Sequence, residues 1–210
     1  MNHLENKLAV GAEQLGVALQ AEQSEKLIKY ICLLALWNKR YNLTAVREPE
    51  EMLVRHILDS LSIFPYVKES NVMDLGSGAG LPGIVLSIMN PDKNYLLLDG
   101  NGKKTRFINQ ARIELKLNNV GVAKSRAESY HPPEPFQAVT SRAFATLADS
   151  TQLLGELLAP GGYFYAMKGK LSIDELAHIP NDYQLEAKHK LVVPGLDEER
   201  HLIVLKRNAL

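Results

Sequence analysis

A glycine-rich turn is the part of this sequence best suited to hold a small molecule. Residues 74–80 read Asp-Leu-Gly-Ser-Gly-Ala-Gly, with glycine at every second position and an acidic residue two places before the first glycine. Glycine tolerates a positive φ and has no Cβ, so such a turn lets the backbone approach a ligand closely. A tight turn between a strand and a helix that binds nothing would show the same glycines. The neighbouring residues must separate these two interpretations.

Two kinds of nucleotide ligand fit this turn. Gly78, Gly80 and Gly83 satisfy G-x-G-x-x-G, the fingerprint of dinucleotide-binding proteins, and Asp99 follows about 20 residues later. The acidic Asp74 and the alternate glycines instead resemble the E/D-x-G-x-G-x-G motif of class I methyltransferases that use S-adenosylmethionine. In such sites the turn accommodates the amino-acid and ribose parts of the cofactor. The turn residues expected to contact it are Gly76, Ser77, Gly78 and Gly80.

Two further polar positions follow expected strands. Asp99 ends the apolar run 95–99, where its carboxylate can accept both ribose hydroxyls of a nucleoside or cap the next helix. Arg126-Ala127-Glu128 comes after the next expected strand, so a backbone amide and a carboxylate would lie beside the adenine. Without a cofactor this second stretch would be an ordinary polar loop.

Several chemistries are excluded by residues that the chain lacks. The single cysteine, Cys32, rules out an internal disulfide and a multi-cysteine metal site, and no histidines show metal-ligand spacing. Methylation of a pyrimidine carbon needs a cysteine nucleophile, but we expect Cys32 in the core, on the apolar stripe of a helix. Methylation of an exocyclic amine commonly uses N/D-P-P-Y/F after the fourth strand, where residues 140–144 read Thr-Ser-Arg-Ala-Phe.

An acceptor such as guanine N7 is consistent with the residues that the chain has and lacks. Its nitrogen already carries a lone pair, so it needs alignment with the methyl–sulfur bond rather than a general base. Arg142 lies where acceptor and cofactor are expected to meet and could orient either one. A structural salt bridge is the alternative role for this arginine.

Charge is balanced overall but clustered locally. The chain has 24 Lys plus Arg and 24 Asp plus Glu, which argues mildly against nonspecific nucleic-acid binding. Residues 100–126, however, hold seven cations against the single acid Glu114. Such a run is either a solvated face or a surface that contacts phosphates. The residues expected to form an RNA-binding rim are Arg55, His56, Lys103, Arg106, Lys168, Arg200 and His201.

The pattern of elements predicts an α/β protein with a mostly parallel sheet, an antiparallel edge and an N-terminal helical extension. Apolar runs near 72–75, 95–99, 120–124, 138–141 and 163–168 alternate with helical patterns, and 191–193 with 201–206 resemble an antiparallel pair. We expect the extension to cover 1–68, with Ser24 capping a helix, and the ligand-binding core to cover 69–210. No apolar run approaches the roughly 20 residues that span a bilayer, and no signal peptide is evident. These features predict a cytoplasmic protein without a membrane partner.

Several stretches together resemble one family. They are residues 37–44 (WNKRYNLT), 55–60 (RHILDS), 74–83 (DLGSGAGLPG), 103–107 (KKTRF), 141–145 (SRAFA) and 199–201 (ERH). This combination is similar to the bacterial 16S ribosomal RNA guanine-N7 methyltransferase G family, also called the glucose-inhibited division protein B family. The resemblance implies a Rossmann-like class I fold, S-adenosylmethionine as cofactor, and methylation of guanine 527 in 16S ribosomal RNA or small-subunit assembly particles. It also implies cofactor contacts at Gly76, Leu81, Ala127, Glu128 and Arg142.

Other functions remain open on the sequence alone. A small-molecule methyltransferase would use the same cofactor site but show no RNA affinity. A nicotinamide-dependent oxidoreductase would use Gly78, Gly80 and Gly83. A noncatalytic RNA-binding module would bind RNA without methyl transfer. We expect a monomeric RNA methyltransferase in which Arg142 orients the reactants and which needs no metal.

Overall fold

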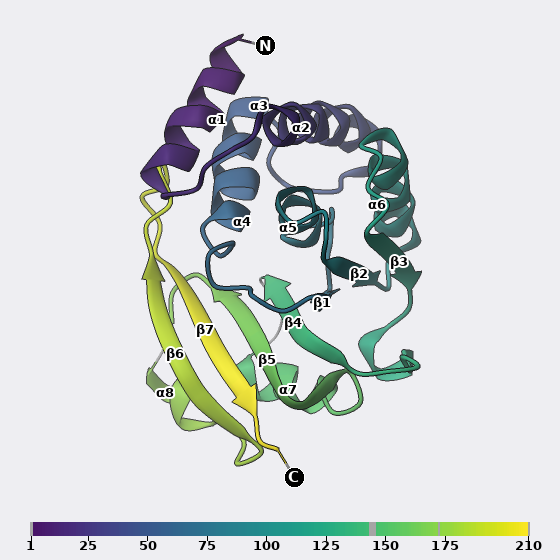
Figure 1. Cartoon of the computed structure of the whole chain (residues 1–210), viewed down its shortest axis with the longest axis vertical. Coiled ribbons are helices and arrows are strands. Elements are labelled where there is room, and N and C mark those ends of the chain that lie inside the picture. The colour runs from purple at the N-terminus through teal and green to yellow at the C-terminus, as the bar shows by residue number, and fades with distance from the viewer. Residues whose placement is uncertain (1, 143–145, 172, 210) are drawn as a thin grey trace.

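The computed structural model describes residues 2–142, 146–171 and 173–209. Its centre is a seven-stranded sheet (Figure 1). The strands are β1 (Asn71–Leu75), β2 (Asn94–Asp99), β3 (Val120–Lys124), β4 (Phe136–Arg142), β5 (Leu158–Lys168), β6 (Tyr183–Leu191) and β7 (Arg200–Arg207). Their order is β3-β2-β1-β4-β5-β7-β6; the first five run parallel, and β7 is antiparallel to both its neighbours. The predicted fold class, with its antiparallel edge, is confirmed.

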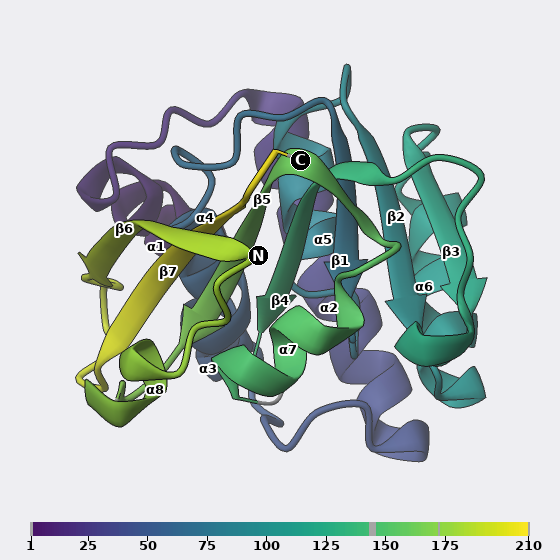
Figure 2. The same ribbon diagram turned by 90° about the horizontal axis from the view of Figure 1, so that it is seen from below.

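Helices cover the two faces of the sheet unequally. One face carries α1 (Asn2–Gln14), α2 (Ala21–Tyr41), α3 (Pro49–Met52), the π-helical turn η1 (Leu53–Leu58), α4 (Asp59–Leu61), α5 (Gly83–Met89) and α6 (Gly102–Glu114). The other face carries α7 (Leu147–Leu153) and α8 (Ile173–Ala177), as Figure 2 shows. A short 3-10 turn, η2 (Ala127–Ser129), follows β3. None of the helices in the described ranges is long and apolar enough to cross a membrane.

The central strands are buried because helices cover both faces. Four of the five residues of β1 are buried, as a strand inside a parallel sheet requires. The larger apolar core joins Leu8 of α1 and Tyr30 of α2 to Ile84 of α5 and Phe107 of α6. The helices of residues 2–61 therefore pack against the same face of the sheet as α5 and α6.

Two expectations about α2 are wrong. The helix begins at Ala21, and its cap is Gln20 in a capping box with Gln23, so Ser24 lies inside the first turn rather than at the cap. Cys32 is exposed, not in the core. The buried stripe of α2 passes through Ile31 and Leu34, and each residue advances the helix by about 100°. Cys32 is thereby turned toward solvent.

The C-terminal half also departs from the expected boundaries. The helix expected over 147–158 ends at Leu153, and β5 already begins at Leu158. The strand expected at 191–193 is instead β6, which ends at Leu191. Most β6 side chains are exposed or half-buried because this strand is the edge of the sheet. Its sequence carries its strand signal as alternation, with Tyr183, Leu185, Ala187 and Leu191 set among polar residues, and not as a continuous apolar run.

Candidate active site

The glycine turn after β1 folds over the end of β2. The backbone N–H groups of Gly76 and Ser77 both donate to the carbonyl of Leu98, at 2.9 and 3.0 Å. Gly76, Gly78 and Gly80 have φ values of 68°, 60° and 91°, in the left-handed region that glycine adopts most easily. The alternate spacing of the glycines thus follows from the backbone path.

Asp74 stabilises the turn from beneath. Its side chain is fully buried, and its carboxylate accepts hydrogen bonds from the Gly83 N–H at 2.9 Å and the Thr140 hydroxyl at 3.2 Å. Burial raises the pKa of Asp74 to about 6, against the lowering effect of these hydrogen bonds. Asp74 lines neither of the cavities beside the turn. Its role in the structure is to join β1 to α5 and β4.

Asp99 lies at the centre of the site. One carboxylate oxygen accepts the Gly78 N–H at 2.8 Å and the other accepts the Asn101 N–H at 2.7 Å. The cap of α6 is Asn101, whose side chain accepts from the Lys103 N–H, so Asp99 is not the helix cap. The ammonium of Lys104 lies 4.0 Å from the Asp99 carboxylate.

Two cavities meet at Gly76 and Asp99 and form a groove along the carboxyl edge of the sheet. One has a volume of about 410 Å³ and includes Ala127 and Glu128; the other has about 360 Å³ and includes Leu81 and Arg142. The groove brings together eight of the nine residues predicted to bind the cofactor: Gly76, Ser77, Gly78, Leu81, Asp99, Ala127, Glu128 and Arg142.

Gly80 is the ninth predicted residue and lines neither cavity. A Cβ at this position would lie 2.7 Å from the Ile84 side chain and 3.5 Å from the Tyr30 hydroxyl. That hydroxyl donates to the Ala79 carbonyl at 2.5 Å in a buried position. The structure therefore gives Gly80 a packing role beneath the turn, against α2 and α5.

Ten lining residues of the groove are not among the predicted cofactor contacts, and three of them lie outside the strand ends and the turns that directly follow them. Leu43 and Thr44 come from the segment after α2, and Lys104 comes from α6. Leu43 and Thr44 belong to the WNKRYNLT stretch that carries the family resemblance, which was the available signal for them. Nothing local in the sequence indicates that this segment reaches the glycine turn.

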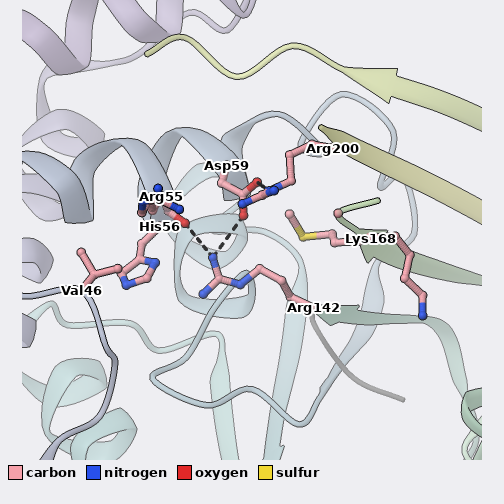
Figure 3. Close-up of a pocket in the computed structure, with 9 residues that line it drawn as sticks. Val46, Arg55, His56, Asp59, Arg142, Lys168 and Arg200 are labelled. Atoms are coloured by element: carbon pink, nitrogen blue, oxygen red, sulfur yellow. Dashed lines mark hydrogen bonds and ion pairs between the residues drawn. The ribbon is translucent and has the colours of Figure 1, made fainter. Parts of the chain in front are cut away.

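A third cavity, of about 370 Å³, adjoins the groove through Arg142 (Figure 3). It brings together four residues predicted for the RNA-binding rim: Arg55, His56, Lys168 and Arg200. The remaining three lie elsewhere. His201 is half-buried, with its ring Nδ1 2.9 Å from the Gly169 carbonyl oxygen, and Lys103 and Arg106 are exposed on α6.

Acidic residues pair with the cations of this third cavity. Arg142 donates from Nη1 to the Asp59 carboxylate at 3.1 Å and to the Arg55 carbonyl at 2.9 Å (Figure 3). Arg55 pairs with Glu198 at 2.7 Å, and Lys168 pairs with Glu175 at 2.5 Å. Arg142 therefore has the structural ion pair that was the alternative for it, while it also lines the groove.

His56 belongs to the cavity as a neutral group at neutral pH. Its side chain is buried, and its Nε2 lies 2.9 Å from the Thr44 hydroxyl. Burial, followed by the charge of Arg142, lowers the pKa of His56 to about 4. Any contact of His56 with an acceptor would therefore be that of an uncharged ring.

The described part of the chain contains no group of three or more His, Cys, Asp or Glu residues placed to hold a metal ion. The predicted acceptor segment at residues 140–144 is described only to Arg142, and Ala143 and Phe144 lie outside the described residues.

The architecture defines a class of protein. A solved structure from Aquifex aeolicus, described as a SAM-dependent methyltransferase, superposes with a TM-score of 0.60 at 17% identity and covers 76% of this chain and 94% of its own. A ribosomal protein L11 methylase from Lactobacillus delbrueckii subsp. bulgaricus gives 0.55 at 18% identity, covering 72% and 77%. The fold is that of the class I methyltransferases.

Sequence comparison narrows this class to one family. Residues 23–203 match the family described as rRNA small subunit methyltransferase G. A protein of that name from Pseudomonas aeruginosa (strain LESB58) is 49% identical over 99% of this chain and 97% of its own length. One from Ectopseudomonas mendocina is 49% identical over 96% and 95%. The chain belongs to the rRNA small subunit methyltransferase G family.

Proposed function

We propose that this protein transfers a methyl group from S-adenosylmethionine to N7 of guanine 527 in 16S ribosomal RNA. The observation that carries the proposal is the junction at Arg142, where the groove beside the glycine turn meets a cavity lined by basic residues. A methyl donor and a nucleotide acceptor need two such adjoining sites. Membership of the rRNA small subunit methyltransferase G family supports the same reaction. The chemistry is also consistent with the site, because the lone pair on guanine N7 can attack a methyl group without a general base.

The residues of the groove fit the proposed cofactor. A Cβ at Gly78 would have no protein atom closer than 4.0 Å, so the turn leaves open space that a ligand can enter. Asp99 provides a carboxylate for ribose hydroxyls, and η2 brings Ala127 and Glu128 to the adenine end. When bound, the cofactor supplies an electrophilic methyl on a sulfonium sulfur.

The acceptor cavity fits a nucleotide. Arg55, Arg142, Lys168 and Arg200 bring guanidinium and ammonium groups to one cavity, where they can contact phosphate or guanine O6. Among the described residues, Arg142 makes both of its hydrogen bonds through Nη1, which leaves Nε and Nη2 available to a ligand. We propose that these free donors orient the guanine while its N7 lone pair attacks the methyl carbon.

The proposed substrate also indicates where the protein acts and what it binds. Ribosomal RNA and small-subunit assembly particles are cytoplasmic in bacteria, so we place the protein there and expect it to act as a monomer. The exposed Lys103 and Arg106 on α6 would extend the RNA-binding surface beyond the cavity.

The decisive test incubates the protein with S-adenosylmethionine labelled in its methyl group and unmodified 16S RNA or small-subunit particles, then maps the labelled base. Label at N7 of guanine 527 is the expected result. Label at another base would overturn the assigned position. RNA binding without label would favour a noncatalytic module, and calorimetric binding of a nicotinamide dinucleotide in place of S-adenosylmethionine would favour an oxidoreductase. Turnover on a small acceptor that is insensitive to salt, without RNA affinity, would indicate a small-molecule methyltransferase.

A further inference from the structure

Asp59 is a buried carboxylate that holds two arginines of the acceptor cavity. It is 2% exposed and lies at the start of α4, directly after the π-helical turn. One carboxylate oxygen accepts from Nη1 of Arg142 at 3.1 Å, and the other accepts from Nε of Arg200 at 3.2 Å. Figure 3 shows Asp59 between the two guanidinium groups.

These three residues come from distant parts of the chain. Arg142 ends β4 and Arg200 begins β7, on opposite sides of β5 in the sheet. Asp59 approaches from the N-terminal helices on one face. A single carboxylate therefore fixes two strand ends to a third element at the mouth of the cavity.

Asp59 fixes the orientation of the Arg142 side chain. Nη1 of Arg142 is held by the Asp59 carboxylate and by the carbonyl of Arg55, two acceptors on adjacent turns of the same helical segment. A guanidinium is planar and rigid, so fixing one nitrogen in this way restricts the direction of Nε and Nη2. Arg142 lines both the groove and the acceptor cavity. Asp59 therefore sets the orientation of the guanidinium at the junction of the two cavities.

We propose that Asp59 is a positioning residue for methyl transfer, acting through Arg142. This inference rests on the proposed function, because it assigns Asp59 a role in that reaction. Asp59 does not contact the reacting atoms. It holds Arg142 so that the free guanidinium donors meet the acceptor base in line with the methyl group, and it keeps Arg200 at the rim. Misplacement of a reactant by about 1 Å can reduce turnover by about 100-fold.

The test uses Asp59→Asn, which keeps the shape of the side chain and removes its charge. We expect kcat to fall by about 10- to 100-fold, while the dissociation constant for S-adenosylmethionine, measured by calorimetry, stays within about threefold of wild type. Glu198→Gln is the matched control. Glu198 pairs with Arg200 and Arg55 in the same network, but the ion pairs of the described residues do not join it to Arg142, so the kcat of Glu198→Gln should stay within about threefold of wild type.

A double-mutant cycle separates positioning from simple stabilisation. If Asp59 acts through Arg142, then adding Asp59→Asn to Arg142→Lys should reduce single-turnover rates by much less than it does in the wild-type background. Additive losses would overturn the proposal. A loss of activity in Asp59→Asn that is no larger than the loss of folded protein, measured by thermal unfolding, would also overturn it. If the wild-type protein labels no RNA, the proposed function fails; if it labels RNA but the cycle is additive, only the role of Asp59 fails.

Discussion

Gly78 offers a direct test of the groove because two different effects of its substitution can be separated. The residue has a φ of 60°, and a Cβ there would have only the Gly76 carbonyl oxygen and the Lys104 ammonium as neighbours, each at 4.0 Å. Both neighbours line the groove. In Gly78→Ala the added methyl group would therefore clash with no protein atom, but it would occupy space that we assign to the cofactor.

The magnitudes follow from this geometry. The left-handed backbone costs a non-glycine residue roughly 1–2 kcal/mol, which lowers Tm by about 2–8 °C in a chain of this size. A methyl group forced into a well-packed site costs about 1–3 kcal/mol. Applied to the bound cofactor, that range raises Kd by about 5- to 150-fold.

Gly16→Ala is the matched control. Gly16 has a φ of 68°, and its Cβ would have no atom within 4 Å, so it carries the same backbone strain in a turn that lines none of the cavities described above. Calorimetric titration with S-adenosylmethionine and thermal unfolding without ligand measure the two effects. We expect similar falls in Tm for both variants and a raised Kd only in Gly78→Ala. An unchanged Kd in Gly78→Ala would refute the placement of the cofactor, and an equally raised Kd in Gly16→Ala would refute the steric reasoning.

Three further predictions follow from individual contacts. Tyr30→Phe removes the hydroxyl that donates to the Ala79 carbonyl; leaving that buried acceptor unpaired should lower the free energy of unfolding by about 1–3 kcal/mol in urea titrations and weaken cofactor binding. Lys103→Ala should reduce RNA affinity and the slope of its salt dependence by about one unit in filter-binding assays, without changing the Kd of the cofactor. His56 has a folded pKa of about 4, below its ordinary 6.5, so the unfolded chain binds its proton more readily and stability from this group is lost as pH falls from about 6.5 to 4. The pKa of Asp74 is raised to about 6, so this group changes stability in the opposite direction over nearly the same pH window. Because His56→Gln removes only the effect of the imidazole, the variant should become more stable relative to wild type as pH falls, by up to about 3 kcal/mol. An unchanged difference in stability between pH 7 and 4 would contradict the burial of the imidazole.

The sheet and the glycine turn were predictable because their signals are local. Apolar runs ending in glycine or aspartate locate β1 and β2, since buried parallel strands read as continuous apolar runs. The bounds of β3 are also as predicted, although this strand lies at an edge of the sheet and is mostly half-buried. The edge strand β6 was misplaced because its apolar residues alternate with polar ones, while the prediction rested on the continuous apolar run at 191–193. The wrong position of Cys32 had a different cause: an apolar helix sequence does not specify which neighbouring residue leaves the buried stripe.

The site was predictable in its residue types but not in its long-range contacts. The groove residues follow strand ends, so chain order alone brings them to one edge of the sheet. The partners of Arg142 were not accessible in this way, because Asp59 is 83 positions away and belongs to another element. Likewise Tyr30 gives no sign in the sequence that its hydroxyl reaches the glycine turn from α2. Such contacts depend on how the helices pack on the sheet.

These contacts show that different segments of the chain form the groove and hold Arg142 in place. The strand ends and the turns that follow them form most of the groove, which the class I methyltransferase fold positions. The segment after α2 and the helical turns before β1 contribute Thr44, His56 and Asp59, which lie toward the acceptor cavity or line it. Arg142 belongs to the first group by its place on β4 and to the second by its hydrogen bonds. Since the N-terminal helices hold that arginine, changes in their packing should alter methyl transfer more than cofactor binding, and the choice of acceptor should depend on these helices together with the ends of β4, β5 and β7 that line the same cavity.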